Sequence, residues 1–136
     1  MSGGPPAGVP GSGRPVWVLL LQRDAPEAMY EAAAMTAAAV SLGLEVTLVW
    51  FDGALDALAG GRLDGQDELS TPGSAGAAGR LFQEARRSGR VRFLACSASM
   101  VGSPSGAQAV RARVDDVVGW PTAISLIRAA ERSFVW

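Results

Sequence analysis

Hydrophobic residues gather in short runs of strand length, and segments with helical character separate these runs. The runs occupy residues 16–21, 45–51, 91–95, 114–118 and 133–136. The intervening segments predict helices at residues 26–42, 54–59, 78–88, 106–113 and 121–131. A continuous apolar run of this length is typical of a strand buried on both faces of a sheet. We therefore predict five strands with helices between them.

Sequence signals at the helix ends support this division. Asp24 precedes the first helix as a candidate N-cap, Pro26 fits its first turn, and Glu27 stands three residues after Asp24 as in a capping box. Gly43 ends the same helix. Residues 97–105, rich in Ser and Gly, predict a loop after the third strand.

Two segments offer little to bury. Residues 1–15 are mostly Gly, Pro and Ser, and predict a disordered tail ahead of a single domain at residues 16–136. Residues 60–79 contain six Gly and indicate a flexible loop, with a mobile lid as the alternative.

The regular alternation of strand and helix predicts an α/β fold. We expect a Rossmann-like three-layer α/β/α domain whose five-stranded sheet is mostly parallel, with helices on both faces. In such sheets the functional site lies at the carboxyl ends of the strands.

Composition then excludes several kinds of chemistry. The chain has 136 residues, 12 basic and 13 acidic, and a formal net charge of −1. It contains no His and a single Cys, so one subunit cannot build a Ser-His-Asp triad, a zinc or iron–sulfur site, or a disulfide. We expect no metal and no cofactor. The near-neutral charge argues against nucleic-acid binding.

No part of the sequence predicts export or membrane insertion. The chain has no basic segment leading into an apolar signal region, and no apolar run reaches the roughly 18 residues of a membrane span. We expect a cytoplasmic protein that does not contact a membrane.

Cys96 falls at the carboxyl end of the third predicted strand, so the one thiol lies where a site is expected. Backbone N–H groups and Ser hydroxyls after it would stabilise a thiolate or a bound anion. The alternative is that Cys96 is a small apolar residue that closes a strand. The residues expected to bind a substrate at this edge are Arg23, Asp24, Asp52, Ser97, Ser99 and Met100.

Four features, taken in order, resemble the DsrE/DsrF-like sulfur-relay family over residues 16–136. An apolar strand is followed by a small-residue helix, and the second strand ends in Trp50-Phe51-Asp52-Gly53. The third ends in Cys96, continued as Cys-x-x-Ser-Met. A Val-x-x-Val-x-Gly segment at residues 114–119 then leads to a terminal aromatic strand.

The resemblance implies a Rossmann-like fold and a homo-oligomer, either a trimer or a hexamer. It implies a sulfur carrier or sulfurtransferase that accepts sulfane sulfur as a persulfide on Cys96 and passes it to an acceptor, with donor and acceptor proteins as partners. Some relatives have a second Cys in this loop, where this chain has Ser97 and Ser99. No internal resolving thiol is therefore present.

Two other functions stay open. One is a non-catalytic module of the same fold that binds a small anion or nucleotide-like ligand at residues 99–106, with Cys96 inert. The other is a structural subunit of a hetero-oligomer.

Several charged and aromatic residues also carry expectations. We expect Arg86 and Arg87 to form a solvated helix end, Asp115 and Asp116 to lie at a strand edge, and Asp64, Asp67 and Glu68 to lie in a solvated loop rather than on a divalent cation. We expect an aromatic side chain at a subunit interface, from among Trp50, Trp120 and Trp136.

Overall fold

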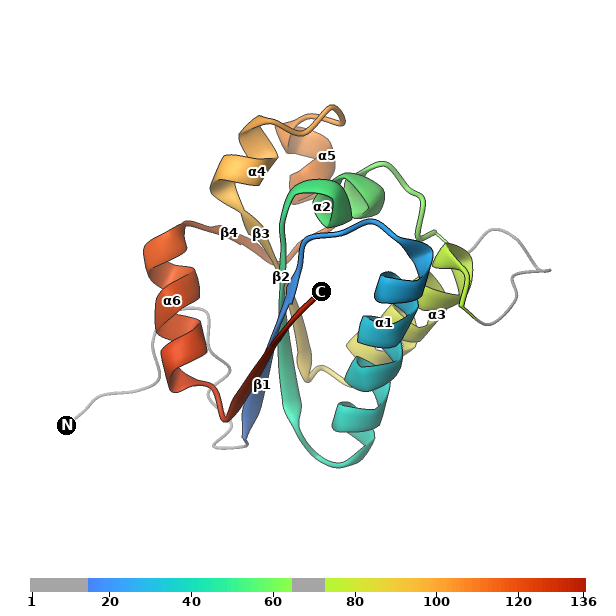
Figure 1. Cartoon of the computed structure of the whole chain (residues 1–136), viewed down its shortest axis with the longest axis vertical. Helices are drawn as coiled ribbons and strands as arrows, with labels where there is room; N and C mark the ends of the chain where they lie inside the picture. Colours follow the sequence, from blue (N-terminus) through green and yellow to red (C-terminus); the bar gives the residue numbers. More distant parts are fainter. Residues whose placement is uncertain (1–14, 65–72) are drawn as a thin grey trace.

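The computed structural model describes residues 15–64 and 73–136 and forms a five-stranded sheet (Figure 1). Its strands are β1 (Val16–Leu21), β2 (Glu45–Trp50), β3 (Val91–Cys96), β4 (Asp116–Val118) and β5 (Arg132–Val135). They lie in the order β4-β3-β2-β1-β5, and every pairing is parallel. The predicted parallel sheet is confirmed.

Helices cover both faces and the carboxyl edge of this sheet. They are α1 (Pro26–Ser41), α2 (Asp52–Ala59), α3 (Ala75–Arg86), α4 (Ser97–Val101), α5 (Ala107–Arg111) and α6 (Trp120–Ala129). Figure 1 shows α1 and α3 on one face, α6 on the other, and α2, α4 and α5 beyond the ends of the strands. This arrangement confirms the three-layer α/β/α architecture.

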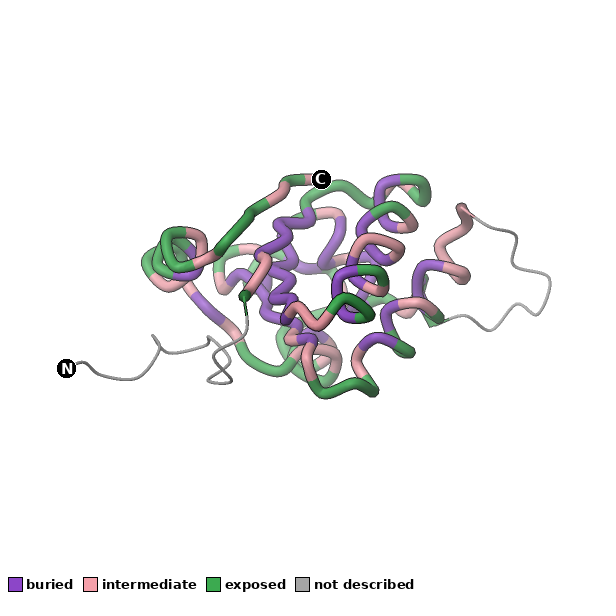
Figure 2. The backbone as a smooth tube through the Cα atoms, turned by 90° about the horizontal axis from the view of Figure 1, so that it is seen from below, coloured by how far each residue is buried: buried purple, intermediate pink, exposed green. Residues whose placement is uncertain are grey.

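Side chains alternate between the two faces along each strand and build two apolar clusters. The larger cluster lies under α1 and α3 and includes Leu19, Leu48 and Phe93. The smaller cluster contains the α6 residue Leu126 and the strand residues Val18 and Leu94. Figure 2 shows the strands as the most buried part of the chain, between the half-exposed helices.

The last strand returns to the first. β5 pairs only with β1, from Trp17 opposite Arg132 to Leu20 opposite Val135. The N–H of Gln22 donates to the carbonyl of Trp136 at 2.8 Å, which continues the pairing beyond the strand. Figure 2 shows β5 as a largely exposed edge.

Local interactions move several element boundaries from their predicted places. Residues 97–105 are not all loop, because the chain turns directly into α4 after Cys96. The third helix, α3, begins at Ala75 rather than residue 78, since the Ser74 hydroxyl accepts from the N–H of Ala77 and caps it. Predictions for residues 1–14 and 65–72 lie outside the described residues, including Asp67 and Glu68.

The prediction that Asp24 caps α1 is wrong. The N-cap is Ala25, with no side-chain hydrogen bond to the helix, and Pro26 occupies the first turn as predicted. The Asp24 carboxylate instead pairs with Arg62.

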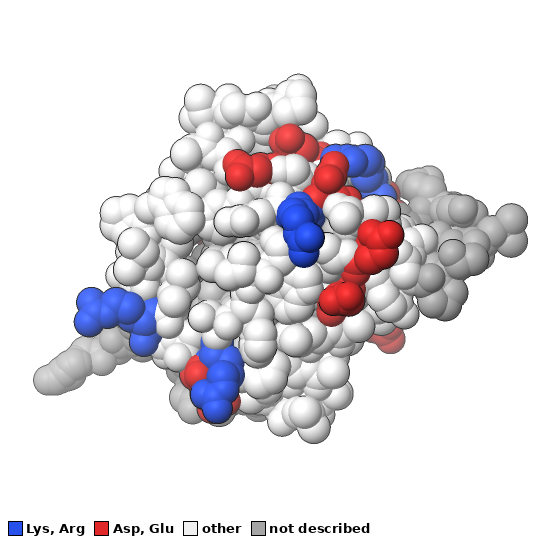
Figure 3. Space-filling model, viewed as in Figure 1, with Lys and Arg blue, Asp and Glu red and all other residues white. Residues whose placement is uncertain are grey.

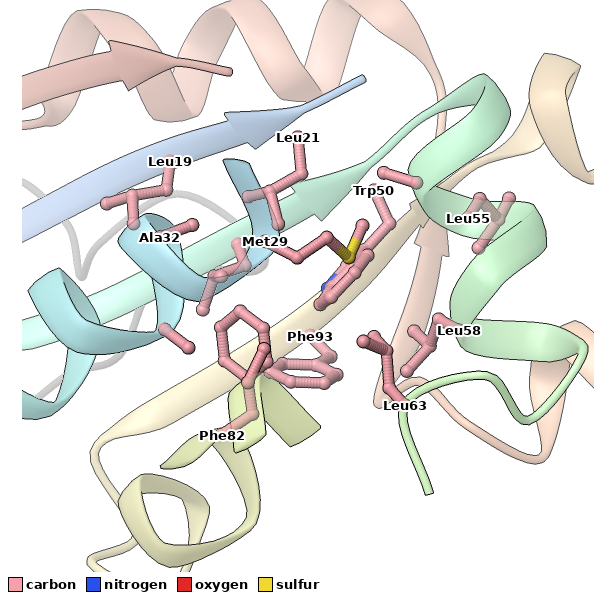
Figure 4. Close-up of a cluster of buried hydrophobic side chains, with 14 of the residues drawn as sticks. Leu19, Leu21, Met29, Ala32, Trp50, Leu55, Leu58, Leu63, Phe82 and Phe93 are labelled. Atoms are coloured by element: carbon pink, nitrogen blue, oxygen red, sulfur yellow. The ribbon is translucent and has the colours of Figure 1, made fainter. Parts of the chain in front are cut away.

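Trp50 is a core residue, which corrects its inclusion among interface candidates. Its side chain is fully buried, and its ring lies 5.4 Å from Phe82 and 5.0 Å from Phe93, measured between centroids. Figure 4 shows these three rings packed together in the larger cluster.

Over residues 15–64 and 73–136, none of the helices has both the length and the apolar character that crossing a bilayer demands.

Candidate functional site

Cys96 is the last residue of β3, at the carboxyl edge of the sheet. Its side chain is only 3% exposed and belongs to the smaller apolar cluster, on the α6 face, together with Phe51 and Val118. Its backbone pairs with Val118 of β4. The thiol is therefore at the predicted edge, but it lies beneath neighbouring side chains.

An aromatic pair spans the position of Cys96. Phe51 follows β2 and Trp120 follows β4, and these strands flank β3 on either side. The two rings stack with centroids 5.0 Å apart and planes inclined by 27°. Since Phe51 is buried and Trp120 is 48% exposed, the indole is the outer member of this cover.

Asp52 carries an unusual backbone conformation at the same edge. Its φ is +43°, a left-handed value that costs a non-glycine residue energy unless its surroundings hold it. Ser99 of α4 supplies that support: its hydroxyl accepts from the Asp52 N–H at 3.1 Å and donates to the Asp52 carboxylate at 3.0 Å. These two hydrogen bonds fix α4, and with it the backbone after Cys96, to the end of β2.

A second polar pair lies beside the first. The Asp24 carboxylate accepts from Arg62 at 3.1 Å, and both side chains are about half-exposed. Gly53 keeps the two turns close, because a Cβ at that position would lie 3.4 Å from the carbonyl oxygen of Gln22 and 3.5 Å from Cγ of Asp24. The ends of β1 and β2 thus form one surface with mixed charge. In Figure 3 the charged side chains on this side of the molecule gather mainly over the upper edge, while the upper part of α6 is uncharged.

The predicted site residues fall into different places. The structure brings Asp52 and Ser99 into direct contact, with Asp24 next to the following residue, Gly53. Arg23 is exposed at the end of β1.

Ser97 and Met100, the other two predicted residues on α4, differ in surroundings. The Ser97 hydroxyl lies near Gly119, at 3.8 Å from the position that a Cβ there would take. Met100 is buried in the larger cluster, so its side chain packs in the core rather than facing this edge.

Sequence reasoning missed two members of this edge. Arg62 lies in a Gly-rich segment without hydrophobic periodicity, so nothing in its neighbourhood indicates a partner. Trp120 and Phe51 were not connected, although both come directly after predicted strands. That shared position is the signal that a parallel sheet turns into proximity.

The remaining charged residues form a separate group on the other face. Arg86 donates to Asp115 at 3.1 Å, and its guanidinium lies over the Phe93 ring, 4.2 Å from the centroid. Asp115 also accepts from the N–H of Phe93 at 2.8 Å. The predictions of a solvated helix end at Arg86 and a simple strand-edge carboxylate at Asp115 are wrong, because each side chain has a tertiary partner.

Asp64 is likewise not a plain solvated carboxylate. It forms a two-pronged ion pair with Arg113, and the hydrogen bond from Arg113 holds the pKa of Asp64 below its ordinary value against a partial opposing effect of burial. Within the described ranges, no group of three or more His, Cys, Asp or Glu side chains could hold a metal ion.

Comparisons with known proteins add no relative: no protein-family model matches the chain, and a search of curated proteins finds no match.

Proposed function

We propose that this chain is a DsrE/DsrF-like sulfur carrier, a sulfurtransferase-type protein that holds sulfane sulfur as a persulfide on Cys96. The observation that carries the proposal is the position of the single thiol. Cys96 ends a central parallel strand, at the edge where sheets of this kind bind ligands, and a half-exposed indole covers it.

The chemistry needs only one thiol. The Cys96 thiolate attacks the terminal sulfur of a donor persulfide, R–S–SH, and forms a new S–S bond while the donor's S–S bond breaks. The products are Cys96–S–SH and the donor thiolate R–S⁻, so the proton stays on the transferred sulfur and no net oxidation occurs. An acceptor thiolate then attacks that sulfur, and Cys96 leaves as a thiolate.

Access to the thiol requires a movement, because Cys96 is 3% exposed. Trp120 is the side chain best placed to move, since its ring is half-exposed and rests on Phe51. Asp52 and Ser99 meanwhile hold the backbone after Cys96 in place. The proposed cycle is opening at Trp120, sulfur transfer at a fixed Cys96, and closure over the persulfide.

The proposal includes partners and a setting. We infer a cytoplasmic homo-oligomer, a trimer or hexamer, that meets a donor protein or small persulfide and an acceptor protein. Trp120 and Ile124 of α6 support a contact surface, because they lie one helical turn apart and are 48% and 51% exposed.

Intact-mass measurement tests the carrier function directly. The protein is incubated with a persulfide donor such as glutathione persulfide, and its mass is recorded before and after reduction. We expect a gain of one sulfur atom that reduction reverses and that Cys96→Ala lacks. The same gain in Cys96→Ala, or no gain in the wild type, contradicts the proposal.

The burial of Cys96 favours one alternative, a non-catalytic module that binds a small anion or nucleotide-like ligand beside an inert thiol. Asp52, Ser99 and Arg62 would then present the polar surface of the site. A native thiol that resists both persulfides and a small disulfide reagent, while such ligands raise the melting temperature, selects this alternative.

A further inference from the structure

A cavity of about 160 Å³ opens on the face of the sheet that α1 and α3 cover, apart from Cys96. It lies between α3, the end of β3, the segment after α2 and the segment after α5. Phe93 reaches it from β3, and because side chains alternate along a strand, Cys96 faces the opposite side of the sheet.

The floor of the cavity is apolar. It consists of Leu58, Leu63, Phe82 and Phe93, each no more than 6% exposed. The Phe82 and Phe93 rings meet edge to face at 5.5 Å. Figure 4 shows Leu58 and Leu63 approaching these rings from the other side. Such walls favour a flat apolar group, and a closed cavity of about 150 Å³ holds a benzene-sized ring.

One wall is built by a close backbone contact. A Cβ at Gly79 would lie 1.6 Å from the carbonyl oxygen of Leu63, so only glycine lets the segment after α2 rest on α3 at this point. This contact fixes Leu63 and Asp64 at the side of the cavity.

The mouth is charged. Arg86 and Arg113 line it together with Asp64, so two positive charges face one negative charge. The guanidinium of Arg86 donates to Asp115 at 3.1 Å and to the carbonyl of Arg113 at 3.3 Å, which uses two of its five N–H groups. Further N–H groups remain to meet an anion, in an orientation fixed by stacking on Phe93.

We propose that this cavity is a binding site for a small aromatic carboxylate, with one ring on the Phe82–Phe93 floor and the carboxylate at Arg86 and Arg113. The cavity size selects the ring, and the excess of positive charge at the mouth selects an anionic group. Planar guanidinium groups match the two oxygens of a carboxylate.

Benzoate is the probe, added to the ¹⁵N-labelled full-length chain and followed by amide chemical shifts. We expect saturable shifts at Phe82, Phe93 and Ala112, with the amide of Cys96 unaffected. Benzyl alcohol, which keeps the ring but lacks the charge, should bind about tenfold more weakly. The absence of saturable shifts at the cavity, or equal affinity for the two compounds, overturns the proposal.

Two variants test the charge at the mouth without touching the floor. Gln83→Glu, at an exposed position of the lining, cancels the excess positive charge and leaves the Arg113–Asp64 pair in place. Arg113→Gln removes one guanidinium. Each should weaken benzoate binding about tenfold and leave benzyl alcohol unchanged. Arg128→Gln, on exposed α6, is the matched control and should bind as the wild type does. Unchanged benzoate affinity in both Gln83→Glu and Arg113→Gln overturns the assignment.

Discussion

The indole of Trp120 lies on the ring of Phe51 at a centroid distance of 5.0 Å, although 69 positions separate the two residues along the chain. The contact joins the ends of β2 and β4, and β3 runs between them. It therefore determines whether the end of β3, where Cys96 lies, faces solvent.

Replacing Trp120 with Ala should expose the thiol. An aromatic pair contributes about 0.5–1.5 kcal/mol, so its loss should speed the reaction of Cys96 with a small disulfide reagent about three- to tenfold. Ile124→Ala is the control, because Ile124 is equally exposed on α6 but has no part in the stack. Equal rates in Trp120→Ala and the wild type would show that the indole does not limit access.

Ser99→Ala should destabilise the fold through Asp52. The substitution removes both hydrogen bonds that support the left-handed backbone of Asp52, at a cost of about 1–3 kcal/mol in the free energy of unfolding. Ser125→Ala is the matched control, since the Ser125 hydroxyl is exposed and bonds only within α6. Urea denaturation measures both, and equal midpoints would contradict this role for Ser99.

Gly79→Ala sets helix propensity against close packing. Alanine is favoured over glycine by about 1 kcal/mol inside a helix, yet its Cβ would lie 1.6 Å from the Leu63 carbonyl oxygen. The clash decides the sign, and we expect a net loss of about 2–4 kcal/mol in the free energy of unfolding. Gly102→Ala meets nothing nearer than 4.0 Å and should be neutral. A stabilised Gly79→Ala protein would disprove the contact.

The Asp64–Arg113 pair predicts a pH dependence. Arg113 lowers the pKa of Asp64 in the folded chain, so the carboxylate favours folding above its unfolded pKa of about 3.9. That contribution is lost as the pH falls through the folded pKa. Arg113→Gln should therefore be less stable than the wild type at neutral pH, by at most about 1 kcal/mol because the pair is partly exposed.

Denaturation of both proteins at pH 7 and at about pH 3 measures this effect. The difference between them should shrink at the lower pH and with added salt. Arg128→Gln, without a role in the pair, should show neither trend. A difference that stays constant with pH would indicate packing of Arg113 rather than charge.

The strands were the most predictable part of the molecule. Residues 16–21 form a strand with the predicted bounds because an unbroken apolar run is a direct imprint of burial on both faces. The position of Cys96 at the carboxyl edge follows from the same pattern. The short helix α4 was missed because five residues with two Ser carry little helical signal. The Asp52–Ser99 bonds that attach this helix join residues far apart in sequence.

The partners of charged side chains were least predictable. Asp24 stands where a helix cap is expected, yet it pairs with Arg62, 38 positions away. Arg86 has the position of a solvated helix end, but the fold places Asp115 and the Phe93 ring beside it. Such pairings depend on which loops meet in space, and single-sequence periodicity carries no information about that.

The return of the chain to β1 has a consequence for how the molecule opens. α6 and β5 form the final unit of the fold, and β5 has one neighbouring strand, so this unit can detach while α1 and α3 remain packed. Such partial unfolding needs less free energy than global unfolding. It would also uncover the cluster that holds Cys96, so amide exchange in α6 and reactivity of the thiol should rise and fall together.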